Sequence, residues 1–325
     1  MNPFEYVAPS DLREASSLLG SRWGQTEVLA GGTDLVTSLK QGITKPKRLV
    51  SLKNIPELKR IQVKKNTVRI GAMVTLRDLA ANATIQEEFP ALVTAIDGIG
   101  SSQIINAGTV AGDLCQRPRC WYFRNGFGLL AEDNGDSLVR TGDNRYHAIF
   151  GNDGRALFVN ASSLAPALIA LQAEISIVGA AGREREINAG DLFQAPNNDE
   201  DREVALRANE IVSEIKLPRE NMQNASYEVR HRHGLDWPYA TASVALKIRS
   251  GIAREASVVL GHVAPTPWPA VAASNLLNGA RVDASLAEAV GEAAARGAKP
   301  LSGNAYKVQM VKTAVKRALL AAANA

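Results

Sequence analysis

The stretch that decides the fold is Ala30-Gly31-Gly32-Thr33-Asp34-Leu35, a glycine pair between a strand-like run and a helical pattern. Residues 27–30 are strand-like, and Leu35, Val36 and Leu39 recur at helical spacing. Two glycines let the backbone turn tightly and approach a ligand closely, and exposed amides at a helix start can bind phosphate. This motif alone leaves two interpretations open, a phosphate-binding turn or an ordinary strand-to-helix turn.

A second turn, Gly108-Thr109-Val110-Ala111-Gly112-Asp113, repeats the same chemistry. Its aspartate adds an acceptor for a ribose or ribityl hydroxyl group. Two such turns in one region favour a bound, extended diphosphate nucleotide, because free peptide amides from both can converge on one pyrophosphate. The chain has no G-x-x-x-x-G-K-[ST] motif, and Gly98-Ile99-Gly100 lacks the third glycine and the upstream strand of a Rossmann fingerprint. The nucleotide site is therefore expected to be of another kind.

Composition limits the class of protein. The chain has 325 residues, of which 46% are hydrophobic and 22% charged, which excludes a disordered or collagen-like protein and suggests two domains or one large one. No apolar run reaches the roughly 18 residues of a membrane span, and residues 1–10 lack a signal-peptide pattern. The net charge of +4 is dispersed, and there are only two cysteines. We expect a cytoplasmic protein with no membrane insertion and no nucleic-acid partner.

The order of patterns predicts an α+β fold in two domains. Strand and helix signals alternate in the first half, which is interrupted by residues 115–158, a long aromatic stretch without a sustained period. We expect that stretch to be an ordered insertion, since structureless loops of this length are uncommon. After Pro218 come three strand-like runs and then helices. The predicted domains are residues 1–218, with the insertion at about 115–158, and residues 222–325, with a three-stranded sheet plus helices.

The sequence assigns neither a metal site nor a catalytic side chain. Cys115 and Cys120 are separated by four residues, and His147 is the only nearby imidazole. A structural zinc site or a four-iron cluster normally needs four ligands, which the insertion does not supply. The nucleophile signature G-x-S-x-G is also absent. Asp236-Trp237 leaves two roles open for the tryptophan, covering a flat ring or packing between domains, of which we favour packing.

Taken together, the segments resemble a known family. In the order expected for it, the chain carries the two glycine turns and the following pieces: residues 52–58, 67–72, 163–171, 209–218, 236–237 and 261–267. The chain resembles the FAD-binding medium subunits of molybdenum hydroxylases, the xanthine dehydrogenase family that includes carbon monoxide dehydrogenase and bacterial aldehyde oxidoreductases. The resemblance covers nearly the whole chain.

The resemblance implies a two-part FAD-binding domain of the vanillyl-alcohol-oxidase (PCMH) type, followed by the C-terminal domain of the CO dehydrogenase flavoprotein type. It implies that the loop of residues 30–35 wraps the FAD diphosphate. Gly108, Thr109, Gly112 and Asp113 would form the second loop around the diphosphate and ribityl chain. Ile211 and Val212 match a position near the isoalloxazine and adenine. Ser163 stands where the family often has an aspartate, so that a hydroxyl replaces a carboxylate on the ribityl side.

The resemblance also implies partners. In such complexes a large subunit oxidises substrate at molybdopterin, a small subunit carries two [2Fe-2S] clusters, and the flavoprotein passes electrons to an external acceptor. We expect a heterotrimer in which FAD is the only cofactor on this chain. Some members carry a four-cysteine iron-sulfur cluster in a similar insertion, but only Cys115 and Cys120 are present here, so we predict an insertion without a cluster. Two alternatives stay open. One is a self-contained flavin oxidoreductase. The other is a flavin-free assembly or scaffold protein, which is suggested by Ser163 and by Ala111-Gly112, where the family often has Gly-Gly.

Overall fold

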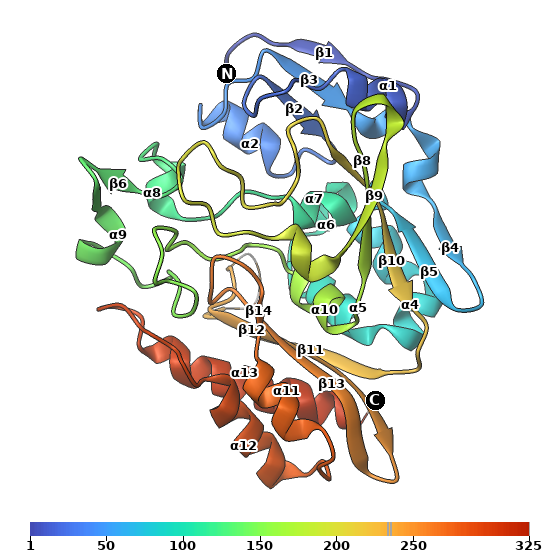
Figure 1. The fold of residues 1–325 in the computed structure, drawn as a ribbon, viewed down its shortest axis with the longest axis vertical. Helices are drawn as coiled ribbons and strands as arrows, with labels where there is room; N and C mark the ends of the chain where they lie inside the picture. Colours follow the sequence, from blue (N-terminus) through green and yellow to red (C-terminus); the bar gives the residue numbers. More distant parts are fainter. Residues whose placement is uncertain (233, 235, 325) are drawn as a thin grey trace.

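The computed structural model describes residues 1–232, 234 and 236–324 (Figure 1). Its N-terminal part begins with a small parallel sheet whose strands β1 (Glu5–Val7), β3 (Arg48–Ser51) and β2 (Thr26–Leu29) lie in that order. Helix α1 (Leu12–Ser17) follows β1, and helix α2 (Leu35–Lys40) follows β2. The predicted order of strand, glycine turn and helix is therefore confirmed.

The second sheet has five antiparallel strands. Their order is β4 (Ile61–Val63), β5 (Thr67–Gly71), β10 (Ile211–Pro218), β8 (Glu174–Val178) and β9 (Glu184–Asn188). The hairpin β8–β9 agrees with the strand runs expected there. The helices of this part are α3 (Leu76–Ala81), α4 (Ala83–Glu88), α5 (Pro90–Asp97), α6 (Ser102–Ala107), α7 (Val110–Leu114) and α10 (Ala165–Ala170). Short 3-10 helices are η1 (Leu52–Asn54), η2 (Pro56–Lys59), η3 (Ala180–Gly182) and η4 (Ala189–Leu192).

Local sequence signals explain where helices start. The Thr75 hydroxyl accepts a hydrogen bond from the Asp78 amide at the start of α3, as the sequence pattern predicts. Helix α5 begins at Pro90, whose missing N–H costs nothing in a first turn. Apolar side chains from these helices and from the five-stranded sheet share one buried core, which includes Leu79, Leu92 and Ile215.

The insertion is ordered around small cores of its own. It contains helix α8 (Trp121–Arg124), the strand pair β6 (Glu132–Asp133) and β7 (Asp136–Ser137), and helix α9 (Leu138–Thr141). Phe123, Leu130 and Phe158 are buried together in its main cluster. In Figure 1 it is the green region that projects from the body of the molecule.

The C-terminal part is an antiparallel sheet covered by helices. The strands are β11 (Gln223–Val229), β12 (Ala240–Arg249), β13 (Ile252–Gly261) and β14 (Trp268–Pro269), and the helices are α11 (Val271–Leu277), α12 (Ala284–Ala294) and α13 (Tyr306–Ala323). The three predicted long strands are present. The structure adds the two-residue strand β14, which lies in a proline-rich stretch and pairs with β13. Proline is tolerated there because β14 is an edge strand.

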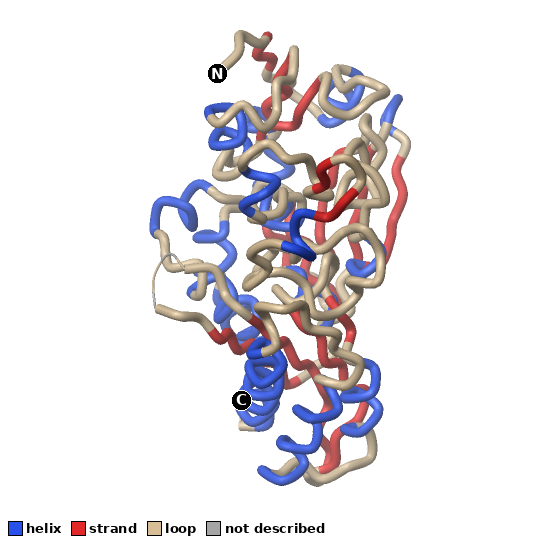
Figure 2. The backbone as a smooth tube through the Cα atoms, turned by 90° about the vertical axis from the view of Figure 1, so that its left-hand side faces the viewer, coloured by secondary structure: helices blue, strands red, loops and turns tan. Residues whose placement is uncertain are grey.

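Strands β12 and β13 are buried on both faces and join the two parts of the molecule. Val244 and Leu246 belong to the C-terminal core under α12 and α13, whereas Ala245, between them, belongs to the N-terminal core. This two-residue period follows from the alternation of side chains along a strand. Helices α5 and α10 accordingly contact the sheet face opposite the C-terminal helices. Figure 2 shows the C-terminal helices beside the strands in the lower part of the molecule.

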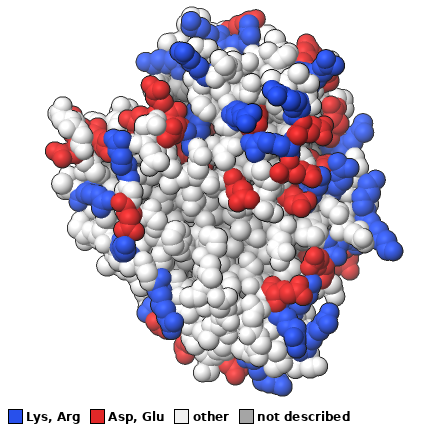
Figure 3. Space-filling view, in the orientation of Figure 1, with Lys and Arg blue, Asp and Glu red and all other residues white. Residues whose placement is uncertain are grey.

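The surface agrees with the dispersed charge of the sequence. Figure 3 shows acidic and basic side chains interspersed over one face of the molecule, with no large area of a single sign. None of the described helices is both long enough and apolar enough to cross a membrane.

Candidate cofactor site

The two glycine loops touch each other. A Cβ atom at Gly31 would overlap the carbonyl oxygen of Ala107 and lie 2.8 Å from its carbonyl carbon. A Cβ atom at Gly112 would lie 2.8 Å from the Thr109 hydroxyl and 3.9 Å from the Ala30 Cβ. Real Cβ atoms do not approach backbone atoms this closely, so residue 31 has room only for glycine. The loops are thus in backbone contact although almost 80 residues separate them.

Two cavities meet at this contact. The first, of about 180 Å³, is bounded by the 30–35 loop and by strand β10. The second, of about 210 Å³, is bounded by α6, the start of α10 and residues 236–238. Every site residue that the sequence predicts lines at least one of them: Ala30, Gly31, Gly32, Leu35, Ile211 and Val212 the first, Gly108, Asp113 and Ser163 the second, and Thr33, Asp34, Thr109 and Gly112 both. The shared residues lie at the junction of the cavities.

The two loops differ in their free hydrogen-bond donors. Within the described residues, the backbone amides of 31–34 donate to no other group. In the second loop, the Val110 amide donates to the Val74 carbonyl at 3.0 Å, and those of Gly112 and Asp113 donate to Thr109 at 3.2 and 2.9 Å. The expectation of free amides therefore holds for the whole first loop but, in the second, only for the Thr109 amide. The other second-loop amides donate to residues of the protein, those of Val110 and Ala111 to the carbonyls of Val74 and Ala72 outside α7.

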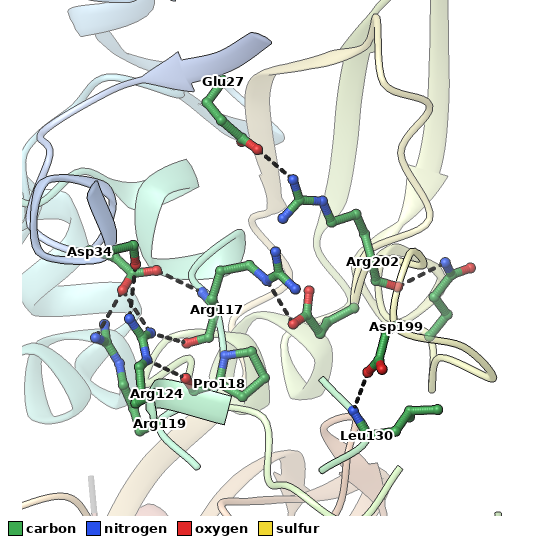
Figure 4. Close-up of polar contacts among 12 residues, drawn as sticks. Glu27, Asp34, Arg117, Pro118, Arg119, Arg124, Leu130, Asp199 and Arg202 are labelled. Carbon is green, nitrogen blue, oxygen red and sulfur yellow. Dashed lines mark hydrogen bonds and ion pairs between the residues drawn. The ribbon is translucent and has the colours of Figure 1, made fainter. Parts of the chain in front are cut away.

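The Asp34 carboxylate anchors the insertion to the first loop (Figure 4). Oδ2 accepts a hydrogen bond from the Arg117 amide at 2.8 Å, and Oδ1 lies 2.9 Å from a guanidinium nitrogen of Arg119 and of Arg124. These arginines were not identified from the sequence, since they lie more than 80 residues from Asp34 in an aperiodic stretch. Asp34 thus fixes the position of the loop.

The Asp113 carboxylate is also satisfied within the protein. It accepts hydrogen bonds from the Ser162 hydroxyl at 2.5 Å, from the Leu164 amide at 3.0 Å and from the Ser163 amide at 3.4 Å. Burial raises the pKa of Asp113, whereas these hydrogen bonds act in the opposite direction. Asp113 therefore ties the second loop to the start of α10, and Ser163 is held at the wall of the second cavity.

Two ion pairs at the first cavity were missed by the sequence analysis. Arg202 lies 2.5 Å from Glu27, and Arg117 lies 2.8 Å from Glu203 (Figure 4). The Arg202 guanidinium also lies 4.8 Å from the centre of the Trp23 ring. Residues 194–210 form no motif, and Arg202 contacts a residue 175 positions away, so no local pattern could have revealed these contacts.

The described carboxylates of the second cavity all have partners. Asp34 and Asp113 are bound as above, and Asp236 pairs with Arg232 at 3.1 Å. Trp237 lies at the rim with 44% of its surface exposed, beneath the Arg119 guanidinium at 4.9 Å. Its contact with Arg119 of the insertion agrees with the favoured role of packing between domains, and its place in the cavity wall leaves the role of covering a flat ring open as well. This arrangement offers no unpaired carboxylate as a general base.

The two cysteines of the insertion lie in different surroundings. Cys120 Sγ is 3.2 Å from His147 Nε2, while Cys115 lines the first cavity. Burial raises the pKa of both thiols and, together with Lys307, lowers the pKa of His147 to about 4. No three His, Cys, Asp or Glu side chains are grouped for a metal ion in the described part of the chain. That the insertion carries no cluster stays a prediction.

Comparison with known proteins covers both parts of the chain. Residues 2–220 match the family described as the FAD binding domain in molybdopterin dehydrogenase, and residues 225–322 match the CO dehydrogenase flavoprotein C-terminal domain. The chain is 30% identical to the aldehyde oxidoreductase FAD-binding subunit PaoB of Escherichia coli, over 96% of each chain. It is 29% identical to the carbon monoxide dehydrogenase medium chain of Hydrogenophaga pseudoflava, over 98% of this chain and 96% of that one.

A solved structure shares the whole fold. Carbon monoxide dehydrogenase from Hydrogenophaga pseudoflava contains a chain that superposes with a TM-score of 0.77 at 28% identity, covering 99% of this chain and 97% of that chain. The resemblance noted in the sequence is thereby confirmed. The touching glycine loops, the paired cavities and these matches over nearly the full length together show that the chain belongs to the family of FAD-binding flavoprotein subunits of molybdopterin dehydrogenases.

Proposed function

We propose that this chain binds one FAD across the first and second cavities, with the diphosphate at the contact between the glycine loops. The observation that carries the proposal is that contact: residues 33, 34, 109 and 112 line both cavities, so an extended ligand can pass from one to the other. The free amides of 31–34 supply donors for the diphosphate. In the second loop, Gly108 and Gly112 have no side chains and so leave room beside the diphosphate. Thr109 lines the same space.

The remaining predicted residues fit the two ends of such a ligand. Ile211 and Val212 present buried apolar surface in the first cavity, which suits a flat ring. Ser163 offers a hydroxyl on the ribityl side of the second. Asp34 and Asp113 act as positioning residues, because their carboxylates hold the two loops in place.

The chemistry suits electron transfer. Bound FAD accepts electrons one at a time and releases them as a pair. The chain itself has to bind and orient the cofactor, and the second cavity offers no unpaired carboxylate among the described residues to take a proton from an organic substrate. This supports an electron-transfer subunit over a self-contained oxidoreductase.

The proposal extends to partners and domains. Relatives are named medium chains or FAD-binding subunits, which supports a complex with a large molybdopterin subunit and a small [2Fe-2S] subunit, and an external electron acceptor. We assign residues 1–218 to an FAD-binding domain of the PCMH type and residues 222–325 to the C-terminal domain.

Titration of the flavin-free chain by calorimetry tests the proposal. We expect one FAD per chain and much weaker binding of FMN, which lacks the adenosine half and fills only one cavity. Absence of FAD binding would instead favour an assembly or scaffold protein. Fast reduction of the bound flavin by an organic substrate, without partner subunits, would favour a self-contained oxidoreductase.

A further inference from the structure

A third cavity, of about 340 Å³, lies between the insertion and the C-terminal part. The insertion contributes Cys120, Trp121 and His147, and the C-terminal part contributes Tyr239 and His262. Nothing in the proposed FAD site accounts for this cavity, although it shares the wall residues 119 and 236–238 with the second cavity.

His262 is the most unusual group in its wall. Only 3% of the residue is exposed, and within the described chain neither ring nitrogen has a hydrogen-bond partner. The nearby Ala161 carbonyl favours the charged ring, but it is not placed for a well-formed hydrogen bond. A buried polar group without a partner is costly, so its retention points to a ligand. The residue also has a φ of 61°, a left-handed conformation that few side chains adopt without strain.

Three described histidines line the cavity, at positions 147, 231 and 262, and the two buried ones, His147 and His262, are neutral. Burial, with help from Lys307 and Arg230, lowers the pKa of His262 to about 3, and burial lowers that of His147 to about 4. His147 Nδ1 also lacks a partner. Each neutral imidazole carries one N–H donor and one acceptor nitrogen. Because no three metal-ligating side chains are grouped among the described residues, these imidazoles are suited to an organic ligand.

The charges around the cavity favour an uncharged ligand over a strongly anionic one. Of the guanidinium groups in the wall, Arg119 is paired with Asp34 and Arg232 with Asp236. The buried Lys307 ammonium donates to the main-chain carbonyls of His147 and His262 at 3.1 and 2.7 Å, which fixes the two histidines. Each described guanidinium group of the wall therefore has a carboxylate partner, although Nε of Arg119 has no hydrogen-bond partner among the described residues.

Aromatic rings form the rest of the wall. Tyr146 and Tyr239 are stacked with centroids 5.5 Å apart, and the Trp121 ring meets Tyr146 edge-on at 5.3 Å. The Trp237 and His262 rings are 6.2 Å apart. Such rings favour a flat aromatic or quinonoid ligand.

We infer that the third cavity binds a flat, uncharged ring that carries carbonyl groups, the quinone class, with His262 donating a hydrogen bond to a carbonyl oxygen. The inference rests on the unpartnered buried imidazole and the aromatic wall, and it does not depend on FAD occupying the other two cavities.

Calorimetric titration of the FAD-treated full chain with 1,4-naphthoquinone tests it. Naphthalene, which has the same ring size without carbonyl groups, should bind roughly tenfold more weakly, since it forms no hydrogen bond. In His262→Asn the asparagine tolerates the left-handed backbone, but its side chain is shorter. The affinity for naphthoquinone should therefore fall roughly tenfold, and the affinity for naphthalene should not change. Tyr227→Phe, on strand β11 and outside all three cavities, is the control and should change neither.

The contrary results are equally clear. No naphthoquinone binding, equal affinity for naphthalene, or full affinity in a folded His262→Asn variant would overturn the inference. Binding that excess FAD abolishes would place the ligand in the flavin cavities and overturn it too. If His262→Asn does not fold, Tyr146→Ala at the more exposed wall serves instead, and unchanged affinity there would count against the site.

Discussion

Replacing Gly31 by alanine is the most direct test of the contact between the glycine loops. The added methyl group would overlap the Ala107 carbonyl oxygen. That carbonyl belongs to the last residue of α6, and the next amide, of Gly108, is hydrogen-bonded to Ile104 at 2.6 Å. The carbonyl therefore cannot turn away without breaking the end of the helix, so the loops have to separate.

The expected magnitude follows from the cost of overpacking. Inserting a methyl group into a tightly packed site typically costs about 1–3 kcal/mol. If the cost falls on binding, FAD affinity should drop by roughly 5- to 150-fold, because about 1.4 kcal/mol corresponds to a factor of ten. If the unliganded fold bears it, the free energy of unfolding should fall by a similar amount.

Two measurements separate these cases: calorimetric FAD titration of the flavin-free protein, and urea denaturation of the same protein. Gly190→Ala is the matched control, since its new Cβ atom would meet only Ile169 Cγ2 at 3.9 Å, an ordinary contact. It should change both free energies by less than about 0.5 kcal/mol. Wild-type stability together with wild-type FAD affinity in Gly31→Ala would refute the close approach of the two loops and, with it, the proposed diphosphate site.

Two further predictions concern charged and titratable groups. Asp34→Ala leaves Arg119 and Arg124, which are largely buried, without their carboxylate partner, so it should lower the free energy of unfolding by about 1–3 kcal/mol and expose the insertion to proteolysis. The control Asp153→Ala breaks the exposed pair with Lys299 and should lower the free energy of unfolding by at most about 1 kcal/mol. Equal effects in the two variants would contradict the anchoring role of Asp34. The pKa of His262 is about 3 in the folded chain and about 6.5 in the unfolded chain, so between these pH values only the unfolded chain takes up the proton. The free energy of unfolding should therefore decrease as the pH falls from 6.5 toward 3, by up to about 1.4 kcal/mol per pH unit. Denaturation of His262→Asn across this range should show a shallower dependence on pH, and an unchanged slope would mean that the folded chain already protonates this ring.

Features encoded by neighbouring residues could be predicted. The glycine turn after β2, the Thr75 cap of α3 and the Asp283 cap of α12 depend on the conformational preferences of a few adjacent residues. The alternation of apolar and polar residues along β12 likewise predicts a strand. The two glycine motifs also direct attention to residues 30–35 and 108–113, which line the two adjoining cavities, whereas Ser163, Ile211 and Val212 were expected there only from the family resemblance.

The tertiary structure alone decided how these pieces meet. The amino-acid order does not say that Gly31 abuts Ala107 or that Asp34 holds Arg124 from 90 residues away. Nor does it say that most amides of the second loop are hydrogen-bonded within the protein while those of the first are free. Nor does it place His262 and His147 in the wall of one cavity. Local backbone preferences act over a few residues and leave a mark in the sequence, whereas these contacts depend on how distant segments pack in three dimensions, which no short pattern records.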